Sequence, residues 1–290
     1  MSRISQENRG RLLMAASALL WGMAGICVRS ITWSPLSQIA VRSILSFAVL
    51  ALLDGTKMKL TKKNILGALC MSATGALYVT AITMTGAGTA IVLQYIAPIL
   101  VFLYSVIFRG RKPSLAEIVI TCLVFAGVVL SFADSLDMTH LLGSLLGLLS
   151  GFTFAGQIII MNGEGSDNGD VLRIACVISA VIFFPFLFFD SGLTFTAKNI
   201  IWMLVLGLFQ YGLANVLFGR GIKHVDSVEG SLILTLEPVF NPIPVWIFLG
   251  ERMGTKAIIG AAAVILGVAA YAVYEGRMKH RAGRAESPRA

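Results

Sequence analysis

Residues 231–251 read SLILTLEPVFNPIPVWIFLGE, an apolar run that contains one carboxylate, Glu237, and three prolines, Pro238, Pro242 and Pro244. The run is long enough to cross a bilayer as a helix, which needs ~20 apolar residues. Yet proline breaks a helix from within, and a charged side chain inside the hydrocarbon costs at least ~2.5 kcal/mol. Such residues in the middle of a membrane segment therefore need a specific role.

The rest of the chain has the same apolar character. Of its 290 residues 57% are hydrophobic and 13% are charged, whereas a soluble domain carries about 25% charged residues. Apolar stretches recur along the chain without the alternation of a membrane β-barrel. The sequence thus predicts an all-α membrane protein. The basic start resembles a signal peptide, but the nine stretches behind it favour an uncleaved first span.

Ten transmembrane helices are expected, at about 12–30, 35–53, 64–84, 88–108, 114–132, 141–161, 171–189, 199–219, 227–248 and 255–275. Lys and Arg concentrate in cytoplasmic loops. If both chain ends are cytoplasmic, the inner segments hold 17 of the 23 Lys and Arg residues and the outer segments hold 4. We therefore predict cytoplasmic N- and C-termini. The net charge of +8 then faces anionic lipid, so it does not indicate nucleic acid.

One loop disagrees with this topology. NGEGSDNGD (162–170) is acidic, although it is assigned to the cytoplasmic side. Acidic residues influence orientation only weakly. The sequence gives no further reason for its charge.

The two halves of the chain resemble each other. Residues 97–132 align without a gap to residues 237–272, with identical positions that include the pairs Pro98/Pro238, Gly110/Gly250 and Gly127/Gly267. We therefore predict two five-helix repeats, 1–137 and 138–290, the second with a short basic cytoplasmic tail from about 276. Because five is odd, the second repeat enters the membrane from the opposite side. Such inverted repeats build transporters, with the substrate site near the midplane.

These features resemble the drug/metabolite transporter superfamily, and within it the EamA-type exporters. The likeness rests on ten spans in two halves, on Trp21-Gly22 late in the first span, and above all on LEPVFNPIPVWIFLGE (236–251). The first half departs from the pattern, because RGR (109–111) stands where the second half has LGE (249–251). A role shared with the Glu251 position is therefore not expected there.

The resemblance implies a multi-pass transporter of the bacterial inner membrane. Members of this family export amino acids, their derivatives or toxic organic compounds, and some import metabolites. The first, third and fourth helices of each half are expected to line the central cavity. Aromatic amino acid exporters have this architecture, but no motif in the sequence singles out that substrate.

Glu237 is the strongest candidate site residue, because it lies about ten residues into the ninth span, near mid-membrane. It is expected to bind a cationic amine or to take and release a proton. The alternative is a buried carboxyl that only packs between helices. Helix bends, or passive packing kinks, are expected at Pro98, Pro238, Pro242 and Pro244, and the freed carbonyls must face protein or a water-filled cavity.

Other polar or aromatic side chains are expected at a similar depth. Gln94 and Tyr95 lie one turn before Pro98 and offer donors and acceptors to a substrate. Interhelical hydrogen bonds are an alternative explanation for a weaker group, Tyr78, Gln157, Gln210 and Asn215. Trp21 either lines the cavity or packs at an interface. The candidate substrate-binding set is Trp21, Tyr78, Gln94, Tyr95, Gln157, Asn215 and Glu237.

Arg42 and Arg173 occupy matching positions in the second helix of each half. We expect each to extend its side chain to a membrane surface, since long basic side chains do so near helix ends. Small residues such as Gly75, Gly260 and Gly267 are expected to allow close helix contacts.

Several chemistries lack their motifs. The three histidines and four cysteines have no metal-ligand spacing, and no cofactor is expected. There is no GxxxxGK[ST] loop for ATP. The DxxD pairs Asp134–Asp137 and Asp167–Asp170 fall in loops, and no serine protease nucleophile motif occurs.

The sequence therefore predicts a secondary transporter, not an enzyme, that exports small organic metabolites by alternating access, with amino acids as the leading substrates. Expected partners are a small-molecule substrate, protons and membrane lipid, in a monomer or homodimer. The first alternative is a flippase of a lipid or lipid-linked carrier. A membrane-embedded enzyme and a channel are further alternatives.

Overall fold

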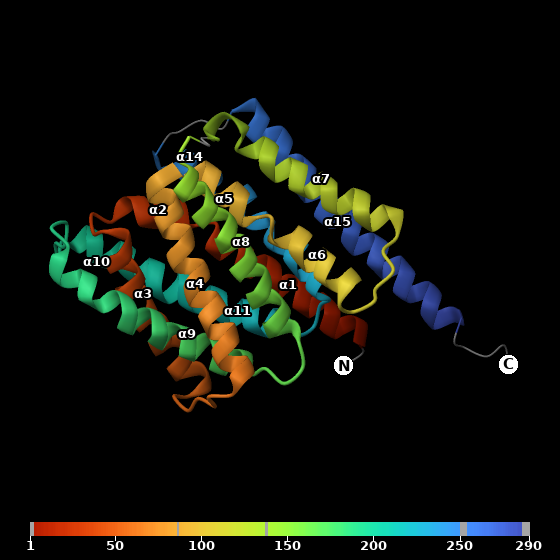
Figure 1. Cartoon of the computed structure of the whole chain (residues 1–290), viewed down its shortest axis with the longest axis horizontal. Coiled ribbons are helices and arrows are strands. Elements are labelled where there is room, and N and C mark those ends of the chain that lie inside the picture. Colours follow the sequence, from red (N-terminus) through yellow and green to blue (C-terminus); the bar gives the residue numbers. More distant parts are fainter. Residues whose placement is uncertain (1–2, 86, 137–138, 250–253, 286–290) are drawn as a thin grey trace.

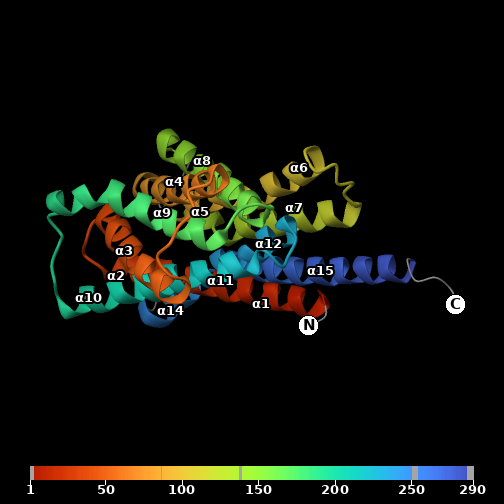
Figure 2. The ribbon, with the colours of Figure 1, turned by 90° about the horizontal axis from the view of Figure 1, so that it is seen from below.

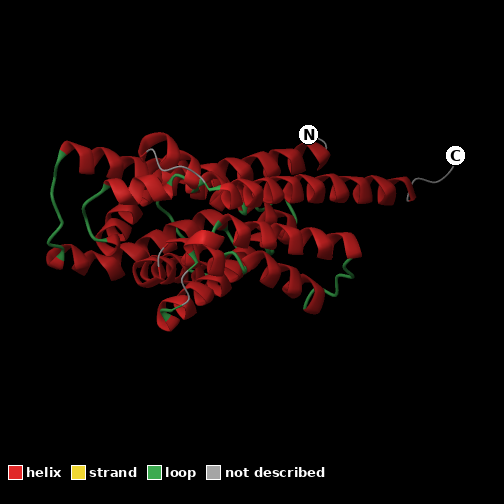
Figure 3. Cartoon of the chain, turned by 90° about the horizontal axis from the view of Figure 1, so that it is seen from above, coloured by secondary structure: helices red, strands yellow, loops and turns green. Residues whose placement is uncertain are grey.

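The computed structural model describes residues 3–85, 87–136, 139–249 and 254–285, and these residues form helices without any strand (Figure 3). The first half contains α1 (Arg3–Trp21) and α2 (Ala24–Ser30), α3 (Pro35–Asp54), α4 (Lys62–Thr85), α5 (Ala87–Gln94) and α6 (Ala97–Ile107), α7 (Leu115–Ser131), and the short turn η1 (Ala133–Ser135). We call these spans 1 to 5, where α1 with α2 forms span 1 and α5 with α6 forms span 4.

The second half repeats this order. It contains α8 (Leu141–Asn162), α9 (Asn168–Phe183) with η2 (Phe184–Phe189), α10 (Ala197–Leu204) with η3 (Val205–Leu213) and α11 (Ala214–Gly221), α12 (Ser227–Leu234) with α13 (Leu236–Phe240) and α14 (Pro242–Leu249), and α15 (Thr255–Ala285). These are spans 6 to 10. Among the described residues eight spans are long and apolar enough to cross a membrane, span 5 is a shorter apolar helix, and α12–α14 cover the predicted ninth span.

The principal helix contacts obey a two-fold relation between the halves. Span 1 packs on spans 8 and 9, and span 6 packs on spans 3 and 4. Span 2 packs on span 7, and span 5 lies beside span 10 (Figure 1). Each of these contacts maps onto another, or onto itself, when five is added to each span number. The chain is therefore an all-α membrane protein of two inverted five-helix repeats.

The helices form two layers that mix the halves. Figure 2 shows α4, α5, α8 and α9 in one layer, and α1, α11, α14 and α15 in the other. Each layer thus contains helices from both repeats. The halves are interlocked, so neither half is a separate lobe.

The loops gather at two ends of the molecule. We call the end that holds the N-terminal residues the terminal face; it carries the loops 55–61, 108–114, 163–167 and 222–226 (Figure 1). Contacts between these loops fix their common location, because Lys63 Nζ donates to the Glu164 carbonyl and Arg111 pairs with Asp226. The opposite face carries the loops 31–34 and 190–196, where Trp33 Nε1 donates to the Thr194 carbonyl at 2.8 Å.

The acidic loop 162–170 lies among basic groups of the terminal face. Lys223 Nζ donates to the carbonyl of Gly163 at 2.8 Å. Asp170 accepts from Arg173 at 2.7 Å and from the backbone N–H of Lys59 at 3.1 Å. The loop is therefore held to neighbouring segments through its backbone carbonyls and the Asp170 carboxylate, contacts that no linear pattern reveals.

Arg111 explains the departure of RGR from LGE between the repeats. Its guanidinium pairs with Glu117 and with Asp226, and it contacts the Tyr271 hydroxyl at 3.3 Å. It thereby links span 5 to span 10 and to the loop before span 9. Glu251, at the matching position, lies outside the described residues.

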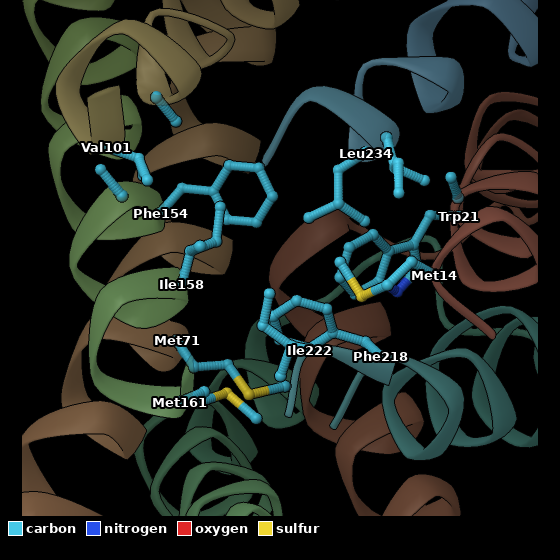
Figure 4. Close-up of a cluster of buried hydrophobic side chains, with 14 of the residues drawn as sticks. Met14, Trp21, Met71, Val101, Phe154, Ile158, Met161, Phe218, Ile222 and Leu234 are labelled. Atoms are coloured by element: carbon cyan, nitrogen blue, oxygen red, sulfur yellow. The ribbon is translucent and has the colours of Figure 1, made fainter. Parts of the chain in front are cut away.

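The largest apolar cluster fills the space toward the terminal face. Figure 4 shows Met14 and Trp21 from α1, Met71 from α4, Ile158 and Met161 from α8, and Phe218 and Ile222 from span 8 and its end. Both repeats contribute to it. This packing closes the terminal side of the molecule.

Asp190 on the opposite face ties span 7 to span 2. Its carboxylate accepts from the backbone N–H groups of Ser34 at 2.7 Å and Gly192 at 2.9 Å. Burial alone would raise the pKa of Asp190, but hydrogen bonds from Ser37, Ser34 and Gly192 outweigh it and lower this pKa. The ionised carboxylate therefore stabilises the fold.

Replacing Asp190 with Asn is expected to lower the free energy of unfolding by about 1 kcal/mol at neutral pH, because a neutral amide accepts these bonds less strongly. A lowered folded-state pKa gives stability above the ordinary value of about 3.9, and this stability disappears as the pH falls through the folded-state pKa. Thermal unfolding in detergent should therefore show a Tm gap between D190N and the native protein that closes below about pH 4.

Asp134→Asn is the matched control on the same face. Asp134 pairs with Lys256, and both side chains are more than half exposed. Exposed pairs contribute little to stability, so D134N should leave Tm unchanged. A D190N gap that persists at low pH would contradict the assigned role of the Asp190 charge.

Candidate functional site

A cavity of about 100 Å³ lies where the two repeats meet, with walls from spans 1, 2, 3, 4, 6, 8 and 9. Six of the seven candidate residues line it: Trp21, Tyr78, Gln94, Gln157, Asn215 and Glu237. The seventh, Tyr95, is buried and contacts Glu237. The structure thus brings together side chains that lie more than 200 residues apart in the sequence.

Spans 4 and 9 are interrupted beside this cavity. α5 ends at Gln94 and α6 begins at Ala97, immediately before Pro98. In span 9, α12 ends at Leu234, α13 contains Pro238, and α14 begins at Pro242. Pro98 and Pro238 therefore interrupt matching helices of the two repeats. Pro242 and Pro244 lie in the first turn of α14, where the missing N–H has no helical acceptor.

Tyr95 satisfies the carbonyl that Pro238 leaves free. A proline at position 238 removes the N–H that would bond to the carbonyl of Leu234 four residues earlier. The Tyr95 hydroxyl lies 3.0 Å from this Leu234 oxygen. Span 4 of the first repeat thus supplies the hydrogen bond that Pro238 removes from span 9 of the second repeat.

The same Tyr95 hydroxyl lies 2.7 Å from Oε2 of Glu237. A phenol carries one proton, and both Leu234 O and an ionised carboxylate only accept hydrogen bonds. The arrangement that satisfies every atom has a protonated Glu237 donating to Tyr95, which donates to Leu234. In the described residues Glu237 makes no ion pair, so its carboxyl faces the cavity without a fixed counter-charge.

Glycines of the opposite repeat pack against both interruptions. A Cβ on Gly151 of span 6 would lie 2.9 Å from the carbonyl oxygens of Leu93 and Gln94. A Cβ on Gly22 of span 1 would lie 3.1 Å from the carbonyl oxygen of Glu237. Only glycine leaves room for backbone at these distances, so each repeat holds the broken helix of the other.

Several polar atoms at the cavity have no partner. Oε1 of Gln210, both amide atoms of Asn215 and Nε of Arg42 are buried without a hydrogen bond, although Asn215 approaches the Tyr211 hydroxyl. Buried polar groups are nearly always satisfied. Unpartnered groups that line a cavity are available to a ligand or to water.

Arg42 does not extend to a membrane surface, so that prediction was wrong. Its guanidinium lies over the ring of Tyr211, 4.4 Å from the ring centroid, and lines the cavity. Arg173 does lie near the terminal face, where it is buried, pairs with Asp170 at 2.7 Å and donates to the Asp54 carbonyl at 3.4 Å. The attraction of a cation to an aromatic face keeps Arg42 inside.

Span 8 presents Gln210 and Tyr211 to the cavity through a π-helical stretch, η3. Such stretches are rare and occur often at functional sites. Nε2 of Gln210 donates to the carbonyl of Trp21 at 3.2 Å, next to the break between α1 and α2. The widened turn lets two consecutive residues reach the same space.

Aromatic side chains form the apolar wall. The ring of Phe154 contacts Trp21 at 6.3 Å and Tyr95 at 6.1 Å between centroids, both edge to face. Phe154 and Trp21 line the cavity itself. The site therefore combines an aromatic wall with a few unpaired polar groups, which is typical of small-molecule pockets.

A second cavity of about 150 Å³ continues from the first toward the opposite face. Both cavities share Ala24, Arg42 and Tyr78. The second one extends to Arg29 and Pro35, beside the loop 31–34. The path from the central cavity thus leads away from the closed terminal face.

Sequence reasoning missed Arg42, Tyr211 and Phe154 as cavity residues. For Arg42 a signal existed, because a charge seven residues into a predicted span is costly unless it faces protein or water. Tyr211 and Phe154 resemble the many apolar residues of these helices. Only the packing of the layers distinguishes them.

Comparison with known proteins identifies the family. The EamA-like transporter family matches the chain twice, at residues 8–133 and 141–273. The protein therefore belongs to the EamA-like transporter family, and it is a multi-pass membrane transporter.

Individual proteins agree with this assignment. An uncharacterized transporter of Archaeoglobus fulgidus is 26% identical over 89% of this chain and 94% of its own length. A probable terminal-alkyne amino-acid exporter of Streptantibioticus cattleyicolor is 32% identical, but over only 29% of this chain and 28% of its own. One solved crystal structure has the same fold, with a TM-score of 0.79 at 17% identity over 93% of this chain and 97% of that one.

Proposed function

We propose that this protein is a secondary transporter that exports small organic metabolites, with amino acids as the leading class, across the bacterial inner membrane by alternating access. The observation that carries the proposal is the cavity between the repeats, where two proline-interrupted helices meet and polar atoms lack partners. Transporters of inverted repeats place their substrate at such a site.

The chemistry of the wall favours amino acids within this class. Glu237 offers a carboxyl to an ammonium group, and the aromatic wall of Trp21 and Phe154 suits an apolar side chain. The matching segment of a probable amino-acid exporter supports the same class.

Alternating access requires a second state in which the terminal side opens. In the present state this side is closed by the apolar cluster of Figure 4 and by the ion pair of Arg11 with the buried Glu229, 2.5 Å apart. Because both layers contain helices of both halves, we propose that the layers, rather than the halves, move against each other. The two ion-paired helices, α1 and α12, would separate when the terminal side opens.

We further propose that Glu237 exchanges a proton during the cycle. With Glu237 protonated, the chain from Glu237 through Tyr95 to Leu234 is satisfied and span 9 is held. Loss of the proton would turn Glu237 into an acceptor for a substrate ammonium group. The single Tyr95 proton would then be shared between Glu237 and the Leu234 carbonyl, which weakens the hold on span 9. Protonation and substrate binding are then alternatives at one carboxyl.

The orientation follows from charge. The terminal face carries most of the Lys and Arg residues, and such faces lie on the cytoplasmic side. We therefore place both termini in the cytoplasm. The path through the second cavity then leads to the periplasmic side.

Counterflow in proteoliposomes tests the proposed function. Vesicles loaded with one unlabelled amino acid are diluted into a trace of the same labelled amino acid, for the twenty amino acids in turn. A carrier accumulates label above the equilibrium level, whereas a channel only equilibrates it. No accumulation of any amino acid would overturn this substrate class, and lipid-linked probes in the same vesicles would then test the flippase alternative.

A further inference from the structure

We infer that Arg42 binds a carboxylate of the transported molecule, so that the substrates are zwitterions or organic acids and not simple amines. The inference rests on the proposed transport function and names the chemistry that this site recognises. Three observations carry it. Other arginines pair with carboxylates, Tyr211 and Gly75 enclose the Arg42 guanidinium, and Glu237 lines the same cavity.

Four other arginines pair with a carboxylate of the chain. Arg11 pairs with Glu229, Arg111 with Glu117 and Asp226, Arg173 with Asp170, and Arg220 with Asp54. Arg42 makes no ion pair with any described residue, and its Nε is buried without a hydrogen bond. An unpaired cation inside a membrane protein is costly. A ligand that supplies the missing anion removes this cost.

Arg42 is held ready for such a ligand. The ring of Tyr211 covers one face of the guanidinium at 4.4 Å. Gly75 lies on another side, where an added Cβ would be 3.3 Å from Nη2 of Arg42. Ser46 Oγ, one turn further along α3, lies 2.6 Å from the Arg42 carbonyl oxygen and 2.8 Å from that of Gly207, so its single proton is shared between α3 and span 8. The guanidinium therefore needs little reorganisation when an anion arrives.

The charged groups of the cavity favour a molecule with one carboxylate over a more highly charged anion. A planar guanidinium forms two parallel hydrogen bonds with a planar carboxylate. Glu237 lines the same cavity as Arg42, so a second negative charge on the ligand would meet this carboxyl. With Glu237 at one side and Arg42 at another, the cavity matches a molecule that carries both an ammonium group and a carboxylate. The unpartnered amide oxygens of Gln210 and Asn215 add acceptors for an ammonium group.

Binding to the purified full-length protein in detergent tests this inference without transport. Titration calorimetry would use phenylalanine, leucine and threonine, each with its amide, its decarboxylated amine and its deaminated acid, together with phenyl phosphate. The native protein should bind the carboxylate-bearing members at least about tenfold more tightly than the matching amides and amines, the expected scale of a charge-assisted bond.

Arg42→Gln should abolish this preference, with about 10- to 100-fold weaker binding of the carboxylates and unchanged binding of the amines. Arg42→Lys keeps the positive charge but cannot donate two parallel hydrogen bonds to a carboxylate. It should therefore show an intermediate preference for carboxylates. Arg109→Gln is the matched control, because Arg109 also lies over a tyrosine, Tyr104, at 5.8 Å but is exposed and outside the cavity. It should bind like the native protein.

If Arg42→Gln does not fold, Gly75→Ala provides the second variant. The added methyl group crowds Nη2 of Arg42 while keeping the charge, and it should reduce the carboxylate preference. Native protein that binds no carboxylate of the panel, or that prefers amides, amines or phenyl phosphate, would overturn the inference.

The outcome is separable from that of the proposed function. Carboxylate-selective binding without counterflow would leave the Arg42 site standing and reject transport of these compounds. Native-rate counterflow of an amino acid by Arg42→Gln, with an unchanged preference over its amide, would reject the Arg42 site and leave the transporter standing.

Discussion

Replacing Glu237 with Gln is expected to reduce transport at least about tenfold while leaving the protein folded and as stable as before. Glutamine has the shape of a protonated glutamate, so its amide can donate to Tyr95 and keep the chain to Leu234. It cannot release a proton or carry a negative charge. Counterflow and net transport driven by a pH gradient, each at several pH values, would measure the loss, and Tm in detergent would measure the fold.

Tyr95→Phe is the matched variant at the other end of the same contact. It removes the hydroxyl and leaves the Leu234 carbonyl, freed by Pro238, without its partner. The expected cost is about 1–3 kcal/mol of stability, the penalty for a buried unsatisfied acceptor. The two variants should therefore differ in kind, since Glu237→Gln loses activity and Tyr95→Phe loses stability. Native-like transport by Glu237→Gln, with native pH dependence, would make Glu237 a packing residue.

Gly151→Ala is expected to lower both the stability of the protein and its transport rate. The new Cβ would lie 2.7 Å from Cγ2 of Ile96 and 2.9 Å from two backbone oxygens, of Leu93 and Gln94. Backbone cannot move aside as a flexible side chain can, so the interruption of span 4 must shift. Overpacking of this kind costs about 1–3 kcal/mol. We also expect transport to fall, because Gln94 would be displaced from the cavity and Tyr95 from its contact with Glu237.

Two glycine variants make this result specific. A Cβ on Gly276 of α15 meets nothing within 4 Å, so Gly276→Ala should be neutral or slightly stabilising. Gly260→Ala would place a Cβ 2.5 Å from the Gly127 carbonyl, between spans 10 and 5, away from the cavity. It should lower Tm as much as Gly151→Ala, yet folded Gly260→Ala should transport at the native rate. Equal transport by folded Gly151→Ala would contradict the proposed role of the span 4 interruption.

Much of the fold was predictable because membrane insertion depends on local sequence. Length and apolar content define the spans, and eight of the ten lie within a few residues of the expected positions. Span 1 begins nine residues earlier than expected, at Arg3, and span 10 continues ten residues further, to Ala285. The repeat was visible because Pro98 and Pro238 mark interruptions at matching positions. A proline acts on its own helix, so its effect can be read without knowing the neighbours.

The candidate site was only partly predictable. Glu237, Gln94 and Gln157 stood out because a polar group within an apolar helix is costly wherever the helix lies. The same rule applied to Arg42, but the expectation that it reaches the membrane surface hid its position at the cavity. Its actual location depends on Tyr211 of span 8 and Gly75 of span 3, which only the packed structure brings beside it.

Ten membrane crossings in two related halves could be predicted from the sequence, because hydrophobic length and helix-breaking residues act within each helix. Tertiary structure alone decided which side chains meet. Tyr95 contacts the carbonyl freed by Pro238, Asp170 bonds to the backbone of Lys59 and to Arg173, and Arg42 turns inward over Tyr211. These pairings depend on how interlocked helices from the two halves pack, and the contacts between distant residues leave no periodic signal in either half.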